Sequence, residues 1–290
     1  MQKKTFNFKS FIEITKLRLS LSVVFSSIIS YIIGIDTLDW NKFIYLILGG
    51  ILMVSASNIF NQVIEKDLDA LMSRTKNRPL PKGEISVNSA LIIGFIFVII
   101  GLTLLYLINP LCSMLGAISI FIYACVYTPL KLVTPLSVFV GAIPGAIPFM
   151  LGWVAATNEI GVEAVTLFSM QFFWQFPHFW AIAWWQNDDY QKAGFKMLPT
   201  GRKDKSTTFQ IIFYSFWAII ISLVPYFGFT GDLMLSIYGL ILVILLGLFL
   251  LYYSFKLFKN STVDNAKKLM YVSILYLTLI QIVYLIDNLF

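Results

Sequence analysis

The sequence predicts an all-α membrane protein, a polytopic bundle of nine transmembrane helices. Its composition points this way, because 58% of the residues are hydrophobic and only 12% are charged, whereas a soluble domain carries about 25% charged residues. The apolar residues fall into runs of about 20, the length that a helix needs to cross about 30 Å of hydrocarbon. These runs are continuous and do not alternate in short segments, which favours helices over a β-barrel.

The predicted spans follow one another with short connections on one side of the membrane and longer ones on the other. They are expected near residues 18–35, 43–60, 87–108, 111–130, 134–155, 163–184, 208–229, 233–255 and 269–288. No low-complexity segment separates them, so residues 1–290 are predicted to form one domain. The first apolar run has no small-residue cleavage site after it and is predicted to be retained as a span.

The basic residues predict the orientation of the bundle. With the N-terminus in the cytoplasm and the C-terminus outside, every Lys and Arg except Lys42 falls on the cytoplasmic side. The positive-inside rule favours this topology, since the reverse would translocate nearly all of these cations. The same rule explains the net charge of +6, so no nucleic-acid partner is predicted. The compact chain favours the inner membrane of a bacterium.

A cluster of oxygen-bearing side chains follows the second predicted span. If that helix continues, Asn61, Glu65 and Asp69 stand four residues apart and share one face, while Asp67 points elsewhere. Two carboxylates and an amide suit a hard cation such as Mg²⁺, which binds through one or two carboxylates, water and substrate phosphate. The spacing predicts a Mg²⁺ site, and a solvated helix end is the simpler alternative.

Basic residues come directly after this cluster. Arg74 and Arg78 lie four residues apart, and their planar guanidinium groups match the oxygens of a phosphate. The positive-inside rule alone would also place cations here. The neighbouring acidic cluster favours a diphosphate site, because a metal ion and arginines together bind diphosphate well.

The second long cytoplasmic connection carries a similar set of residues. Asp188 and Asp189 are adjacent, so a helix directs only one of them to the site. Asp189 is predicted to bind metal or diphosphate, and Lys192 follows within reach of the same anion. Both loops end in a Leu-Pro-x-Gly pattern, at residues 80–83 and 198–201. This similarity suggests a parallel internal repeat with a binding site between the halves.

His178 is the only histidine in the chain, which excludes a bis-histidine haem redox site built from this chain alone. It lies on the sixth predicted span, roughly 16 Å before Asp189 on the same helix face. Two interpretations are open. The side chain contacts a haem bound as substrate, or it packs between helices beside Phe179 and Trp180.

Together these residues resemble the intramembrane UbiA-type prenyltransferase superfamily, and most closely its haem-modifying branch, the protohaem IX farnesyltransferases (haem O synthases). Asn61, Glu65 and Asp69 match the first acidic motif of the superfamily, with glutamate in place of its usual first aspartate. Identifiable motifs extend from about Lys16 to Lys205. The other stretches that carry the resemblance are residues 67–80, 127–131, 141–153, 177–180 and 189–199.

The resemblance implies a Mg²⁺-dependent enzyme that transfers a farnesyl group from farnesyl diphosphate to a vinyl group of haem b. Addition of water then gives haem O. Asn61, Glu65 and Asp69 would hold the metal, with Asp189 on the opposing loop. The residues implied to neutralise the departing diphosphate are Arg74, Arg78, Lys131 and Lys192. The implied surroundings are membrane lipid and a downstream haem A synthase.

Two departures from the superfamily pattern affect these expectations. The second Asp-x-x-x-Asp motif is absent, so only Asp188 or Asp189 remains as a ligand for a second metal ion, and Lys196 stands where the haem branch often has proline. Two other functions stay open: a prenyltransferase for an aromatic quinone precursor, and a secondary transporter. The transporter is disfavoured because the acidic residues predicted on the cytoplasmic side lie on loops or span ends, not mid-span.

Overall fold

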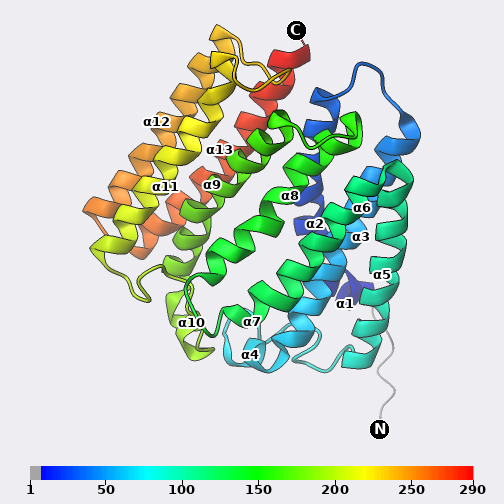
Figure 1. Cartoon of the computed structure of the whole chain (residues 1–290). Coiled ribbons are helices and arrows are strands. Elements are labelled where there is room, and N and C mark those ends of the chain that lie inside the picture. Colours follow the sequence, from blue (N-terminus) through cyan, green and yellow to red (C-terminus); the bar gives the residue numbers. More distant parts are fainter. Residues whose placement is uncertain (1–7, 290) are drawn as a thin grey trace.

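Figure 1 shows the computed structural model, which describes residues 8–289 as a bundle of long, roughly parallel helices. Within these residues there is no strand, so the all-α prediction is confirmed for them. Segment η1 is π-helical and η2 is a 3₁₀ turn. The elements are α1 (Phe8–Thr15), α2 (Leu17–Ile33), α3 (Trp40–Ile64), α4 (Lys66–Leu71), α5 (Val87–Ile108), α6 (Pro110–Phe121), η1 (Ile122–Tyr127), α7 (Thr128–Leu130), α8 (Ser137–Thr157), α9 (Val162–Trp185), α10 (Asn187–Lys192), α11 (Lys205–Leu223), η2 (Val224–Phe227), α12 (Ile237–Lys259) and α13 (Val263–Leu289).

Seven helical stretches among the described residues are long and apolar enough to cross a membrane, and the bent pair α1–α2 would make an eighth. Helix α9, the sixth predicted span, has 24 residues but is not among them. Polar side chains, among them Gln171, Gln175 and His178, interrupt its apolar residues. Nine crossings and the orientation therefore stay predictions, and the N-terminal cations Lys3 and Lys4 lie outside the described residues.

Side-chain caps set where the long helices begin. Asp39 accepts hydrogen bonds from the backbone N–H groups of residues 41 and 42 at the start of α3. Ser86, Asn109 and Ser236 cap α5, α6 and α12 in the same way. Each cap satisfies backbone donors that have no partner within the helix. In the apolar region these caps fix the ends of the spans.

Helix α8 packs between α2 and α9 and carries two prolines, Pro144 and Pro148. Pro148 has no N–H for the Pro144 carbonyl, and Ser119 of α6 donates to that oxygen at 3.4 Å instead. On the other side, Gln171 and Gln175 of α9 donate to carbonyl oxygens of α8 at 2.9 Å each. Polar side chains from neighbouring helices thus satisfy backbone groups that lipid cannot.

Small residues allow α2 and α8 to approach closely. Ser27 of α2 donates to the Pro148 carbonyl at 2.7 Å. A Cβ atom added at Gly152 would collide with the carbonyl oxygen of Ser27. Membrane helices commonly associate through such small residues, because packing and hydrogen bonds replace the hydrophobic effect inside lipid.

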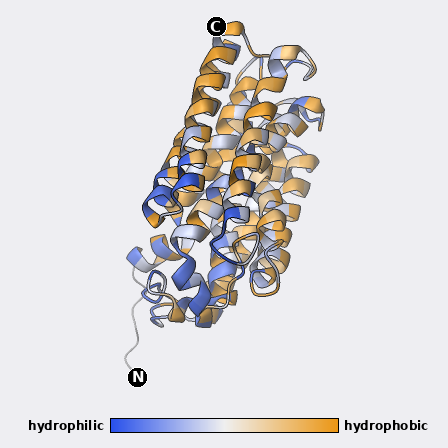
Figure 2. Cartoon of the chain, turned by 90° about the vertical axis from the view of Figure 1, so that its left-hand side faces the viewer, coloured by the Kyte–Doolittle hydropathy of each residue, from blue (hydrophilic) through white to orange (hydrophobic). Residues whose placement is uncertain are grey.

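The short helices α4, α7 and α10 gather at one end of the bundle, whereas α13 ends at the opposite end (Figure 1). Hydrophilic residues concentrate towards the end that holds these short helices (Figure 2). The two long loops predicted to carry the chemistry therefore meet at one polar end of an apolar bundle.

Candidate active site

Asn61, Glu65 and Asp69 form a buried polar ladder at the end of α3. Helix α3 ends at Ile64 and α4 begins at Lys66, but the backbone bonds run on: the Glu65 N–H reaches Asn61 O at 2.9 Å, and the Asp69 N–H reaches Glu65 O at 2.7 Å. The three side chains are almost completely buried, while Asp67 is exposed. The predicted shared face is confirmed, and Asp67 points away from it.

Each carboxylate of the ladder has a cationic partner. Arg78 Nη1 lies 2.6 Å from Asp69 Oδ2, and Lys131 Nζ forms an ion pair with Glu65 Oε1. Asn61 donates to the Thr128 hydroxyl at 3.3 Å. Buried carboxylates need such counter-charges, because desolvation of an isolated ion is very costly. Two of the cations predicted to bind diphosphate thus also contact the predicted metal ligands.

Lys131 lies directly after η1 and α7. The Tyr127 and Phe195 rings flank its ammonium group, with centroids 4.9 and 5.1 Å from Nζ. Burial lowers the pKa of Lys131, and the Glu65 carboxylate opposes this shift. The π-helical turn that leads into the residue is a feature often found at functional sites. Lys131 is therefore held in place on three sides, by Glu65 and by two aromatic faces.

One oxygen of the ladder has no partner among the described residues. Asp69 Oδ1 is buried and accepts no hydrogen bond within the described residues. No group of three or more His, Cys, Asp or Glu side chains converges on a metal position in that part of the chain. The ladder offers two carboxylates and an amide, which fits Mg²⁺ when substrate phosphate and water supply its other ligands.

Asp189 of α10 joins the second loop to the first. Its Oδ2 accepts from the Arg74 backbone N–H at 3.1 Å, and its Oδ1 accepts from Lys192 Nζ at 3.0 Å. Lys192 in turn lies 3.3 Å from the Ser73 hydroxyl. Desolvation opposes the shift, but the hydrogen bonds from Lys192, Arg74 and Ser73 lower the pKa of Asp189 to about 2. Asp189 is therefore firmly ionised at the junction of the loops.

Two of the predicted site residues lie at the surface of this junction. Arg74 is exposed, and its backbone N–H contacts Asp189. Residues 72–83 form successive turns rather than a helix. Asp188 is 88% exposed and lies 3.7 Å from Lys203 Nζ. Of the two adjacent aspartates, only Asp189 contacts the first loop, as their spacing on a helix predicted.

The two loops share a backbone design. Glu65 joins α3 to α4 with φ −93° and ψ 7°, and Gln186 joins α9 to α10 with φ −93° and ψ 14°. Both following turns use a glycine with positive φ, Gly83 at 65° and Gly201 at 76°, a conformation that glycine adopts most easily. These local matches support the internal repeat that the sequence suggested.

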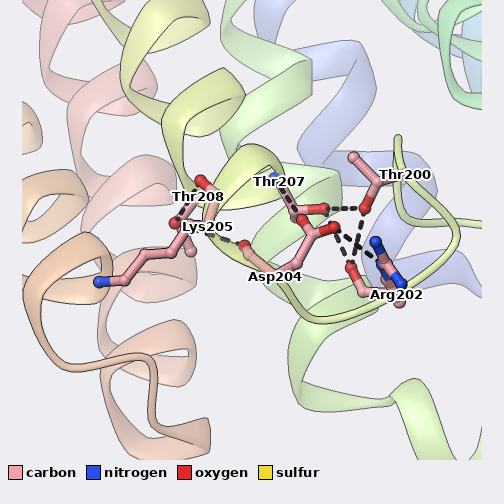
Figure 3. A network of polar contacts seen from close by, with 6 residues as sticks. All are labelled: Thr200, Arg202, Asp204, Lys205, Thr207 and Thr208. Atoms are coloured by element: carbon pink, nitrogen blue, oxygen red, sulfur yellow. Dashed lines mark hydrogen bonds and ion pairs between the residues drawn. The ribbon is translucent and has the colours of Figure 1, made fainter.

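A polar network closes the second loop at the start of α11 (Figure 3). Asp204 accepts from the Thr207 N–H at 2.8 Å and from Arg202 Nε at 3.1 Å. Thr200, next to the Leu-Pro turn, shares a 2.8 Å hydrogen bond with Thr207. The network fixes the exit of the loop without contacting the polar ladder.

The comparisons with known proteins agree with this architecture. A model of the UbiA prenyltransferase family matches residues 23–279. The chain belongs to this family. With its apolar helices, this member of the UbiA family is a multi-pass membrane protein.

Similar UbiA-family proteins include two protoheme IX farnesyltransferases. That of Christiangramia forsetii is 60% identical over 96% of this chain and 93% of its own length. That of Flavobacterium psychrophilum is 59% identical over 97% of this chain and 95% of its own. A digeranylgeranylglyceryl phosphate synthase structure has a TM-score of 0.81 at 21% identity, covering 97% of this chain and 98% of that one.

A second similar structure is a UbiA homologue from Archaeoglobus fulgidus bound to DMAPP and Mg²⁺. Its TM-score is 0.71 at 16% identity, covering 93% of this chain and 98% of that one. At such identities the likeness shows that the fold is shared.

Lys16 is a further candidate for the site, which the sequence patterns did not single out. It stands between α1 and α2 in the left-handed conformation, with φ 47° and ψ 48°. Its ammonium group lies close enough to the polar ladder for the charges of Glu65, Asp69, Arg78 and Lys131 to act on it. In the sequence it looks like one of several N-terminal cations, and no local pattern separates it from them.

His178 lies apart from the ladder, about two turns before the end of α9. Its Nδ1 is 2.9 Å from the Ser273 hydroxyl of α13, and its ring stacks on Trp174 with centroids 4.7 Å apart. The packing contacts expected of an interhelical histidine are therefore present.

Proposed function

We infer that the chain transfers a farnesyl group from farnesyl diphosphate to a vinyl group of protohaem IX (haem b), with addition of water, to give haem O. The observation that carries the reaction type is the buried Asn61–Glu65–Asp69 ladder with its cations Arg78 and Lys131. Haem b is inferred as the acceptor because two protoheme IX farnesyltransferases are about 60% identical to this chain over nearly its whole length.

The ladder is the proposed Mg²⁺ site. Asn61, Glu65 and Asp69 supply oxygen atoms on one helix face, and Asp69 Oδ1 has no partner within the described residues. When bound, Mg²⁺ would neutralise charge on the diphosphate and ease its departure. Asp189 is the proposed ligand from the opposing loop, whereas Asp188, exposed beside Lys203, is the weaker candidate.

The cations next to the ladder are the proposed diphosphate contacts. Arg78 and Lys131 already touch the carboxylates and are placed to bridge them to phosphate oxygens. Lys192 and Arg74 lie at the junction of the two loops, and Lys16 is near the ladder itself. Cations fixed around a leaving group stabilise the charge that develops as its bond breaks.

The position of the ladder suits both substrates. The diphosphate occupies the polar end of the bundle, and the isoprenoid chain extends among apolar helices, which shield an allylic cation from water. A haem vinyl group attacks this cation, and water adds to the resulting porphyrin-conjugated cation and loses a proton, which leaves a hydroxyl group. His178 is the proposed haem contact within the bundle.

The surroundings of the enzyme are also part of the proposal. We place it in the bacterial inner membrane as nine spans, with the polar ladder on the cytoplasmic face, because the basic residues follow the positive-inside rule. Its product would pass to a downstream haem A synthase.

The test is an assay of the purified protein in detergent with haem b, farnesyl diphosphate and Mg²⁺, read by mass spectrometry. The expected product is haem b with a farnesyl group and a hydroxyl group added across one vinyl bond, and it disappears when a chelator removes Mg²⁺. A parallel reaction offers an aromatic acid as acceptor. Prenylation of that acid, with haem b unmodified, would replace the acceptor and keep the reaction type.

A further inference from the structure

The hydrogen bonds around His178 fix which ring nitrogen carries the proton. Ser273, which is completely buried, donates its hydroxyl proton to the Met270 carbonyl at 2.7 Å. A hydroxyl has one proton to give, so at the 2.9 Å contact with His178 the Ser273 oxygen accepts and Nδ1 donates. The network therefore assigns the Nδ1–H tautomer to the imidazole.

The plane of the ring is fixed as well. Trp174 stacks on the imidazole at an interplanar angle of 17°, and its indole N–H donates to the Ser273 carbonyl at 2.5 Å. Phe179 approaches the ring edge, with centroids 5.4 Å apart. The stacking partner and the hydrogen-bond partner are thus both anchored on residue 273 of α13. Rotation of the imidazole would break the Nδ1 contact and the stack together.

The remaining ring nitrogen is left with a lone pair. A neutral imidazole that is protonated on Nδ1 is an acceptor at Nε2. No hydrogen bond to Nε2 is found among the described residues, and the Met270 carbonyl, which accepts from Ser273, also interacts with the imidazole. A histidine that binds a metal through one nitrogen and donates through the other has this arrangement, in which the second contact sets tautomer and orientation.

We propose that Ser273 is a positioning residue that presents His178 Nε2 as an axial ligand to the iron of the substrate haem. The proposal rests on the function inferred above and deepens it by naming how the acceptor is held. Helix α9 carries His178 about 10 Å before its end, and Asp189 follows on α10. Helix α9 would then fix the position of the porphyrin ring relative to the loops that hold the diphosphate.

The direct test is a titration of ferric haem b into the purified full-length protein in detergent, followed by absorption and electron paramagnetic resonance spectra. The wild-type protein should give a histidine-ligated haem. His178→Ala should lose that signature, bind haem b at least tenfold more weakly, and regain the signature with added imidazole. Iron-free protoporphyrin IX, which has no metal to ligate, should bind wild type and His178→Ala equally.

Ser273 is tested with three variants. Ser273→Ala should keep the histidine but weaken haem binding about tenfold or more, as loss of a contact behind a metal ligand typically does. Ser273→Thr retains a hydroxyl and should restore most of the affinity. Ser254→Ala is the matched control, because Ser254 is equally buried on α12 and bonds Ser215 and the Leu250 carbonyl instead of a histidine.

An unchanged haem spectrum and affinity in folded His178→Ala would overturn the proposal, as would equal haem binding by Ser273→Ala and Ser254→Ala. Farnesyl transfer measured on the same samples separates this proposal from the proposed function. A wild-type protein that farnesylates haem b without a histidine signature refutes the ligand alone. A histidine-ligated haem that is never farnesylated supports the ligand and refutes the function.

Discussion

Asp69 and Arg78, nine residues apart in the chain, meet as an ion pair whose atoms Oδ2 and Nη1 are 2.6 Å apart. The Asp69 side chain is completely buried, and the arginine is 19% exposed. The turn that brings them together is held by Thr75, which donates to the Asp69 carbonyl at 2.8 Å. One carboxylate oxygen is thereby neutralised by the chain, while Oδ1 stays without a partner among the described residues.

Arg78→Ala should destabilise the protein as well as impair substrate binding. Removal of one partner from a buried pair leaves an uncompensated charge and costs about 3–5 kcal/mol, which thermal unfolding in detergent would detect. Arg202→Ala is the control, since its pair with Asp204 involves an arginine that is 81% exposed and such pairs contribute about 0–1 kcal/mol. Equal losses in both variants would contradict the importance of burial at Asp69.

The two aspartates of α4 should differ sharply in function. Asp69→Asn keeps the shape of the side chain but removes a negative charge from the proposed Mg²⁺ site, and kcat should fall about 100-fold or more. Asp67→Asn changes an exposed residue of the same short helix and should leave kcat within twofold. Turnover by mass spectrometry at several Mg²⁺ concentrations measures both. Full activity of a folded Asp69→Asn protein would remove Asp69 from the metal site.

Local spacing allowed the polar ladder to be predicted from sequence. Asn61, Glu65 and Asp69 recur every four residues, and a helix converts that spacing into one face whatever the rest of the fold does. The break at Glu65 did not disturb this face, because the i to i−4 backbone bonds continue through it. The apolar runs likewise set the long helices, since their length depends only on local composition.

Contacts between residues far apart in the sequence could not be predicted from local sequence patterns. Thr128 bonds Asn61 across 67 residues, and Ser273 bonds His178 across 95. Neither residue type is unusual in a membrane helix, so nothing in the sequence marks them. The number of crossings is a different case. Gln171 and Gln175 lower the hydropathy of α9, and a hydropathy value does not include the hydrogen bonds by which both side chains are paired with α8 carbonyls.

Asp189 should remain ionised throughout the useful pH range. Its pKa is lowered to about 2 in the folded protein, from an ordinary value of 3.8. Its contribution to stability is therefore present above about pH 4 and is lost as the pH falls through the folded pKa. The difference in melting temperature between wild type and Asp189→Asn should be constant from pH 5 to 8 and shrink only towards the acid end.

The neighbouring aspartate provides the control for this measurement. Asp188→Asn alters an exposed carboxylate whose partner, Lys203 Nζ, is 3.7 Å away, and should not change the melting temperature at any of these pH values. A stability difference for Asp189→Asn that already varies between pH 5 and 8 would mean that the hydrogen bonds from Lys192 and Arg74 do not hold its pKa low.

Lys16 should show a conflict between stability and activity. A left-handed conformation costs a non-glycine residue roughly 1–2 kcal/mol, so Lys16→Gly should unfold at the same temperature as wild type or higher. The lost ammonium group should nevertheless lower kcat/KM for farnesyl diphosphate by about 10–100-fold, the worth of one hydrogen bond to a charged group. Arg18→Gly should give the opposite pattern. Arg18 is exposed in the first turn of α2, where glycine costs up to about 1 kcal/mol of stability, and activity should persist. A Lys16→Gly protein with full activity would show that the strained backbone at Lys16 does not serve the site.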